Sequence, residues 1–182
     1  MAGANESGVV LEVPEAEPLV ARWRQRHDPA ADTGVPAHIT LLYPFIPPDR
    51  LTPESLEALR TIARRAIPFR FALVGVDEFP GLLWLRPEPS SAFVALMRQL
   101  WAAYPSFPAY GGRYPDPTPH LTVAVVEPGE GQEALRRELE GELAGQLPVE
   151  CAASALTILG SDAGGRWSAR HRFALRGSSS QQ

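Results

Sequence analysis

The chain has 182 residues and a formal net charge of −4, and all 17 of its basic residues are arginines. The length is enough for one domain with a sizeable core, and the acidic balance excludes a long surface for duplex nucleic acid, which needs many uncompensated cations. The absence of lysine excludes P-loop enzymes, Schiff-base enzymes and ligases that charge a lysine with AMP.

The single cysteine, Cys151, permits no internal disulfide and no zinc knuckle. Residues 1–10 carry neither the basic region nor the apolar stretch of a signal peptide, and no apolar run reaches transmembrane length. We therefore predict a cytoplasmic protein without membrane association, folded as a single domain over 1–182. The last six residues, 177–182, are expected to form a disordered tail.

Short apolar runs bounded by proline or glycine predict strands, and apolar residues at helical spacing predict helices. In the first half of the chain, strands are predicted at 7–13, 38–46, 69–79 and 82–86. Helices are predicted at 15–27 and 52–66. The second helix has Thr52 as a favourable N-cap, Pro53 at its first position and Pro68 after its end.

In the second half of the chain, helices are predicted at 91–104 and 132–147, and strands at 120–126, 151–159 and 166–176. The segment 105–119 between the first of these helices and the next strand holds five prolines and two glycines. A loop of this length in a compact domain is often functional.

The order of elements after residue 38 is repeated after residue 120: strand, helix, proline, strand, turn, strand. This duplication predicts an α+β fold in one domain of two similar lobes. Each lobe would hold an antiparallel sheet with helices on its outer face, and a pseudo-twofold axis would relate the two sheets. The active-site cleft would lie between the lobes.

A tripeptide of the form H-x-T begins each duplicated strand, as His38-Ile39-Thr40 and as His120-Leu121-Thr122. Residues two apart in a strand point to the same face. The histidine and threonine of each motif therefore share a face, and the apolar residues between and after them are expected to face the core. That expectation covers Ile39, Leu41, Leu121, Val123 and Val125. The alternative is a pair of core histidines bonded to neighbouring threonines.

Two such motifs in a duplicated chain of this size resemble the two-histidine (2H) phosphoesterase superfamily. The resemblance is closest to bacterial 2′-5′ RNA ligase-like proteins and RNA 2′,3′-cyclic phosphodiesterases. Its specific parts are residues 36–45 and 119–126, and it spans about Val9 to Leu175. The resemblance implies that the two motif histidines are catalytic and that the two motif threonines hold the phosphate.

Histidine suits this chemistry because a neutral imidazole accepts a proton and an imidazolium donates one, both near neutral pH. On a 2′,3′-cyclic phosphate, one histidine would take a proton from water while the other protonates the leaving ribose oxygen. With an RNA 5′-hydroxyl in place of water, the reverse reaction would form a phosphodiester. The residues do not assign acid and base; the resemblance implies that His120 activates water. No cofactor is needed, and no metal-ligand motif is present.

Further residues are candidates for contact with the substrate. Arg170 and Arg172 share one parity of the last predicted strand and would face the cleft, although a solvated strand face is an equal alternative. Arg113 and Tyr114, in the loop before the second motif, would clamp a phosphate or a base. Tyr43 would stack on a base, with a place in the core as its alternative.

The predicted partner is an RNA terminus or a nucleotide with a cyclic phosphate, bound by a monomer. The predicted activity is a metal-independent phosphodiesterase, with 2′-5′ RNA ligase activity as its reverse. One alternative is a cyclic phosphodiesterase for small molecules, such as an ADP-ribose cyclic phosphate. The other is a module that binds a nucleotide or RNA end without turnover, which would have no need of a proton shuttle.

Overall fold

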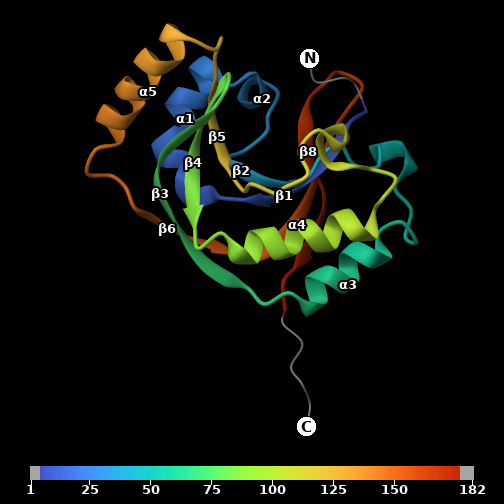
Figure 1. The fold of residues 1–182 in the computed structure, drawn as a ribbon. Helices are drawn as coiled ribbons and strands as arrows, with labels where there is room; N and C mark the ends of the chain where they lie inside the picture. The colour runs from blue at the N-terminus through green and yellow to red at the C-terminus, as the bar shows by residue number, and fades with distance from the viewer. Residues whose placement is uncertain (1–4, 177–182) are drawn as a thin grey trace.

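A curled antiparallel sheet of eight strands forms the centre of the computed structural model, which describes residues 5–176 (Figure 1). The expected tail at 177–182 lies outside the described residues. The strand order across the sheet is β6-β3-β4-β5-β2-β1-β7-β8. The strands are β1 Ser7–Glu12, β2 His38–Leu42, β3 Phe69–Phe79, β4 Leu82–Glu88, β5 Leu121–Val125, β6 Val149–Ala153, β7 Ala155–Ser161 and β8 Trp167–Ala174.

Within the described residues, five α-helices and three short 3₁₀ helices connect the strands. The α-helices are α1 Glu17–His27, α2 Pro29–Asp32, α3 Glu57–Arg65, α4 Ser91–Ala103 and α5 Glu130–Leu143. The 3₁₀ helices are η1 Pro14–Ala16, η2 Pro48–Arg50 and η3 Ala109–Gly112. No helix in the described part of the chain is both long and apolar enough to cross a membrane.

Helices α1 and α4 each pack against the half of the sheet that does not contain the strand before them. Helix α1 follows β1 but lies on β5, and α4 follows β4 but lies on β2. Their apolar faces supply large core side chains, including Trp23 of α1 and Phe93 and Leu100 of α4, each at most 1% exposed. This exchange of helices joins the two halves through one continuous core.

The expectation of two separate sheets is wrong, because the two lobes share one sheet. Strands β2 and β5 pair directly, with Ile39 opposite Leu121. Each of these two strands places a fully buried apolar side chain where they pair. The pairing therefore satisfies the backbone hydrogen-bonding groups of both strands and also makes the core continuous between them. The duplicated motifs are therefore neighbours at the middle of the sheet.

The predicted strand at 151–159 is also divided differently. The chain breaks pairing at Ser154, so that β6 pairs with β3 at one edge of the sheet while β7 pairs with β1 and β8 in the other half. One continuous apolar run in the sequence thus forms two strands in different parts of the sheet. Apolar content alone does not reveal such a break, because both pieces are buried on at least one face.

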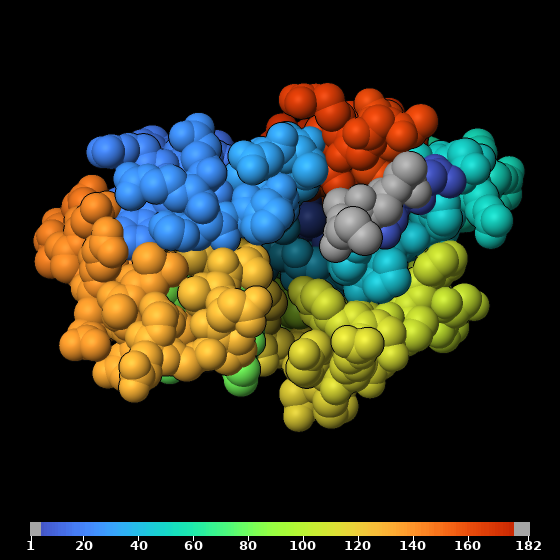
Figure 2. Space-filling view, turned by 90° about the horizontal axis from the view of Figure 1, so that it is seen from above, coloured from blue at the N-terminus to red at the C-terminus, as the bar shows by residue number. Residues whose placement is uncertain are grey.

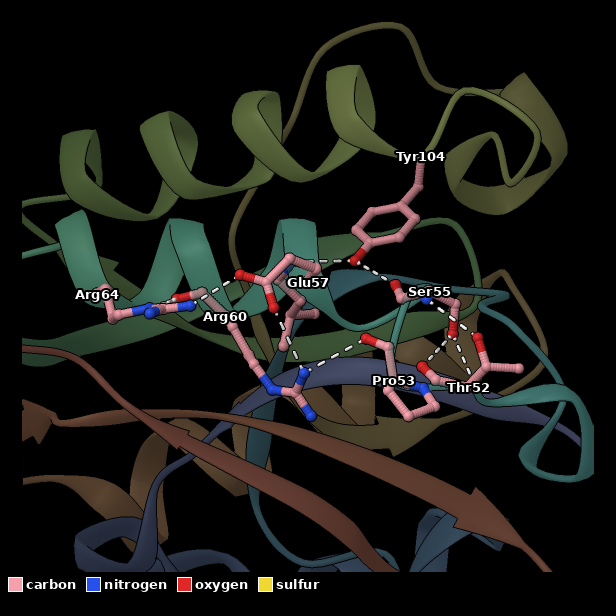
Figure 3. A network of polar contacts seen from close by, with 8 residues as sticks. Thr52, Pro53, Ser55, Glu57, Arg60, Arg64 and Tyr104 are labelled. Atoms are coloured by element: carbon pink, nitrogen blue, oxygen red, sulfur yellow. Dashed lines mark hydrogen bonds and ion pairs between the residues drawn. The ribbon is translucent and has the colours of Figure 1, made fainter.

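Helix α3 begins later than the predicted residue 52. The Tyr104 hydroxyl accepts the N–H of Leu59 and donates to the carbonyl of Ser55, two groups that would bond to each other in a continuous helix (Figure 3). Thr52 instead closes a turn with Ser55 before the helix. A tyrosine from the end of α4 therefore replaces the first turn of the predicted helix.

Candidate active site

The two motif strands present their polar side chains on one face of the sheet. Ile39 and Leu121, paired across the seam, are both fully buried in the core. Directly opposed residues of an antiparallel pair share a face, and neighbours along each strand alternate. The opposite face therefore carries all four predicted catalytic side chains: His38, Thr40, His120 and Thr122.

The antiparallel register also crosses the two motifs. It sets His38 opposite Thr122 and Thr40 opposite His120, and opposed Cβ atoms in such pairs are about 4.5–5.5 Å apart. Each histidine thus lies beside the threonine of its own strand and the threonine of the other. Two imidazoles and two hydroxyls form one compact cluster at the centre of the sheet.

A cleft of about 720 Å³ lies over this part of the sheet. Figure 2 shows the surface hollowed where the blue N-terminal helical segment, the amber segment and the red-orange C-terminal strands come together. Its lining includes His38, Thr40 and Tyr43 from the first motif region, Val125 from β5, and Trp167 from β8. The cleft therefore brings both halves of the sheet to one site.

An extra residue interrupts the alternation just after each motif threonine. The pairing of β2 with β1 skips Leu41, and the pairing of β5 with β4 skips Val123. A bulge of this kind re-aims the side chains that follow it. Tyr43 and Val125 consequently line the cleft. Strict alternation had predicted that Val125 faces the core, but it is 48% exposed.

Both motif histidines are held in the same way by the backbone. The Nδ1 atom of His38 lies 2.8 Å from the Pro36 carbonyl, and the Nδ1 atom of His120 lies 2.8 Å from the Thr118 carbonyl. A carbonyl only accepts, so each Nδ1 carries a proton and donates it. In the neutral ring, Nε2 then carries no proton and is the basic atom in both motifs.

Burial keeps both imidazoles in their neutral form in the free protein. Burial lowers the pKa of His38 to about 4, and the nearby charges of Arg24 and His120 act in the same direction. The hydrogen bond to Pro36 and the carboxylate of Asp28 oppose this shift without cancelling it. Burial also lowers the pKa of His120. The two rings are close enough for the charge of one to affect the other.

Two aromatic side chains hold the ring of His120. Phe79 meets this ring edge to face with a centroid distance of 5.4 Å, and Trp84 does so at 5.9 Å. Trp84 also stacks on Phe79 at 5.0 Å and lies opposite Thr122 in the sheet. The aromatic residues of the β3–β4 hairpin therefore limit the rotation of the second motif histidine.

Side chains of α1 and its C-cap hold the segment that leads into the first motif. Arg24 is 3% exposed and donates to the Asp28 carboxylate at 2.9 Å and to the Val35 carbonyl at 3.1 Å. The Glu17 carboxylate accepts the backbone N–H of Ala37. The carbonyl that binds the first motif histidine lies between these two anchors. Only its contacts identify Arg24, because a helical arginine is ordinarily an exposed residue.

Of the predicted substrate-binding residues, Tyr43 lines the cleft directly. Its ring centroid is 6.4 Å from that of Trp167, and its hydroxyl donates to Glu6 at 2.9 Å. Tyr114 is 62% exposed in the loop before the second motif, and its neighbour Arg113 is exposed beside it. The ring of Tyr114 meets that of Tyr110 edge to face at a centroid distance of 5.9 Å.

The structure does not bring the two arginines of the last strand together. Arg170 packs over Gly160 beside Pro48, on the face of the sheet away from the cleft. Arg172 lies opposite Thr157 on the cleft face, but three strands from the first motif, or about 14 Å at the usual strand spacing. The register between β7 and β8 shifts at a bulge between Ile158 and Leu159, so the side chains of β8 change face there. A prediction from strict alternation does not include this change.

The chemistry available to the site is acid–base catalysis on a bound anion. Two imidazoles and two hydroxyls lie on one face of the sheet. Of these, His38 and Thr40 line the cleft, and tyrosine and tryptophan rings border it. Within residues 5–176, no group of three or more His, Cys, Asp or Glu side chains is placed to hold a metal ion.

Comparison with known proteins finds solved structures of similar fold. Escherichia coli LigT in complex with 3′-AMP has a TM-score of 0.60 and 18% identity, covering 94% of this chain and 98% of that chain. LigT with NADP⁺ gives 0.57 and 19%, covering 96% and 99%. The protein TT0787 of Thermus thermophilus gives 0.55 and 18%, covering 95% and 99%. These solved structures share the fold.

No curated protein sequence matches the chain. A family model does: that of the 2′-5′ RNA ligase superfamily matches residues 12–165, which include both H-x-T motifs and most of the eight strands. The chain therefore belongs to the 2′-5′ RNA ligase superfamily.

Proposed function

We propose that this protein is a metal-independent phosphodiesterase that opens 2′,3′-cyclic phosphates at RNA ends or on nucleotides. The observation that carries the proposal is the paired presentation of two histidines. In both, Nδ1 is bound to a backbone carbonyl and Nε2 is the remaining basic atom, on one face above adjacent strands. Two proton-transfer groups beside one phosphate are what this reaction needs.

In the proposed reaction, the Nε2 atom of one neutral imidazole takes a proton from water as the water oxygen bonds to phosphorus. The bond from phosphorus to one ribose oxygen breaks, and the other imidazole, protonated at Nε2, gives its proton to that oxygen. The Thr40 and Thr122 hydroxyls donate to the nonbridging oxygens, where negative charge increases in the transition state. The reverse reaction, with an RNA 5′-hydroxyl in place of water, forms a phosphodiester.

The proposed substrate is a nucleotide or an RNA end rather than a long duplex. LigT was solved with 3′-AMP, and a cleft of about 720 Å³ accommodates a nucleotide. Tyr43 borders the cleft and is proposed to stack on the base, while Arg113 and Tyr114 are proposed to contact the chain beyond the phosphate. These contacts are of the stacking kind that single-stranded nucleic acids favour.

The test is turnover of 2′,3′-cyclic mononucleotides, cyclic-phosphate-ended RNA and ADP-ribose cyclic phosphate, each with EDTA present. We expect activity on a cyclic nucleotide or RNA end, undiminished by EDTA. His38→Ala and His120→Ala should each lower kcat by about 10²–10⁴-fold while the protein stays folded. Thr40→Val and Thr122→Val should lower it less, because each removes one donor and keeps the shape.

Three outcomes would contradict the proposal. Activity lost in EDTA and restored by a divalent ion would indicate metal-bound water instead. Turnover confined to the ADP-ribose compound would indicate a small-molecule phosphodiesterase. Tight binding of all three ligands without turnover would indicate a binding module.

A further inference from the structure

The ring of Tyr43 lies against the only glycine of β1. Gly8 lines the cleft beside the ring, and a Cβ atom added to Gly8 would lie 3.3 Å from Cδ2 and 3.6 Å from Cβ of Tyr43. A methyl group at this position would therefore force the ring to move by a few tenths of an ångström. The glycine makes room for the ring where it borders the cleft.

The hydroxyl of Tyr43 is bound at the other end of the ring. It donates to the Glu6 carboxylate at 2.9 Å. Burial, together with this hydrogen bond, raises the pKa of Tyr43 to about 12, so the phenol keeps its proton at neutral pH. Glu6 is itself fixed to β7, because its N–H donates to the Ser161 hydroxyl and its carbonyl accepts the Ser161 N–H, both at 2.8 Å. The phenolic proton is therefore used within the protein.

The backbone of Tyr43 is held as well. Its carbonyl accepts the N–H of Tyr110 in η3 at 2.6 Å. With the backbone, the edge of the ring and the hydroxyl all in contact, the side chain has a defined position before any ligand binds. A preorganised ring loses little conformational entropy when a ligand stacks on it, which strengthens binding.

The surroundings of the ring suit the flat face of a nucleobase. The ring of Trp167 adjoins it at a centroid distance of 6.4 Å and an angle of 50°. Val10 and Leu159 line the cleft nearby and form an apolar cluster against which Trp167 packs. In the other half of the sheet, Val125 takes the position equivalent to Tyr43, and valine has no ring face on which a base could stack. We therefore expect the base on the side of the cleft that Tyr43 borders.

We propose that Glu6 is a positioning residue for Tyr43, and that Glu6 and Gly8 together hold its ring as a fixed platform on which the nucleobase of the substrate stacks. This inference rests on the proposed function, in which a nucleotide occupies the cleft. It assigns the ring of Tyr43 to the base and its hydroxyl to Glu6, not to the phosphate. The platform then contributes to substrate binding and not to the chemical step.

The experiment compares two substrates that differ in the base. One is adenosine 2′,3′-cyclic phosphate, and the other is 1-O-methylribose 2′,3′-cyclic phosphate, in which a methoxy group replaces adenine. Tyr43→Phe keeps the ring but releases it from Glu6. Its KM for the adenosine compound should rise about 3–10-fold, the equivalent of one ordinary hydrogen bond, with little change in kcat. Its kcat/KM for the base-free compound should stay at the wild-type value, because that compound makes no stacking contact.

Changes at the two supporting residues test how the ring is held. Glu6→Ala should raise the KM for the adenosine compound by a similar factor. Glu6→Gln should recover most of this loss, because its amide oxygen still accepts the phenolic proton. In a Tyr43→Phe background, Glu6→Ala should add nothing further. Gly8→Ala should also raise this KM, and Gly131→Ala is its matched control, because a Cβ atom there meets nothing within 4 Å.

An unchanged KM for the adenosine compound in Tyr43→Phe would overturn the inference. So would a loss of the same size on the base-free compound, which would indicate a general loosening of the cleft. A lower kcat at unchanged KM would place the hydroxyl in the chemical step and would also contradict the proposal. If Gly8→Ala did not fold, the variants of Glu6 and Tyr43 would still decide the outcome.

Binding of 3′-AMP, measured by calorimetry, separates this inference from the proposed function because it needs no turnover. Tyr43→Phe and Glu6→Ala should each raise its Kd about 3–10-fold. A wild-type protein that binds 3′-AMP with this dependence but turns over no cyclic phosphate would count against the proposed function alone. An active protein in which neither variant changes Kd or KM would count against the inference alone.

Discussion

The Nδ1 atom of each motif histidine is bound to the carbonyl two residues earlier, so the tautomer of each ring follows from the local backbone alone. This clamp requires the strand to begin at the histidine with an extended segment before it. Pro36 and Pro119 are suited to that geometry, because proline is excluded from a continuing helix and tolerated at the start of a strand. The local sequence thereby leaves Nε2 as the unprotonated atom of each neutral ring.

The buried neutral histidine makes the stability of the protein depend on pH. The pKa of His38 is about 4 in the folded protein, against 6.5 for an unperturbed histidine. The unfolded chain therefore binds more protons between these values. The stability from this residue is complete above pH 6.5 and is lost as the pH falls toward 4. We expect about 1–2 kcal/mol less stability at about pH 5 than at neutral pH.

Urea unfolding of the wild type and of His38→Gln across this pH range measures the effect. The variant should lose less stability on acidification than the wild type, because glutamine does not titrate. An equal acid sensitivity in wild type and His38→Gln would contradict the assignment.

At the scale of elements, α3 shows how a partner from elsewhere in the chain sets a helix boundary. Tyr104 is 8% exposed, and its ring meets Phe45 edge to face at 4.9 Å. Its hydroxyl occupies the position of a backbone hydrogen bond between Leu59 and Ser55 (Figure 3). The first turn of the predicted helix gives way because this hydroxyl satisfies the same two backbone groups.

Tyr104→Phe should destabilise the protein by about 1–3 kcal/mol, because it leaves a buried N–H and a carbonyl without their partner. The unfolding midpoint in urea measures the loss, and activity should be unchanged because the residue is remote from the cleft. Arg64→Ala, which removes an exposed ion pair with Glu57 in the same network, should cost at most about 1 kcal/mol. A Tyr104→Phe variant as stable as Arg64→Ala would show that the hydroxyl contributes little.

The bulges at Leu41 and Val123 also decide which side chains reach the cleft. They occupy equivalent positions just after the two motif threonines. Each one sends the residue three places after its threonine, Tyr43 or Val125, into the cleft. Strict alternation predicts the correct face of the sheet for the motif side chains before each bulge. It predicts the wrong face for the side chains that follow the bulge.

At the scale of the whole molecule, the two halves of the sheet cannot unfold separately. Helices α1 and α4 each cover a strand of the opposite half, and the segments of β6 and β7 are consecutive in the chain but lie in different halves. We therefore expect a single cooperative unfolding transition, as for one domain. Far-UV circular dichroism and tryptophan fluorescence should follow the same curve.

Ile39→Ala tests this coupling at the seam. Removal of a fully buried side chain where β2 meets β5 should lower stability by about 2–4 kcal/mol and shift both curves together. A second transition in the variant, or separate curves in the wild type, would indicate that the halves are independent units.

The sequence by itself determined the four motif side chains, the superfamily and the nature of most elements. Two H-x-T motifs, each followed by an apolar run, predict the local strand geometry, because alternation along a strand is a property of neighbouring residues. The helices α1, α4 and α5 follow in the same way from apolar spacing within one segment.

Only the tertiary structure decided that the motif strands pair with each other, that two bulges re-aim Tyr43 and Val125, and that β8 changes parity. It also decided which residues support the histidines. Arg24, Phe79 and Trp84 carry no motif. They act through contacts with residues distant in the chain, and sequence periodicity predicts which face a side chain lies on but not which residues it contacts there.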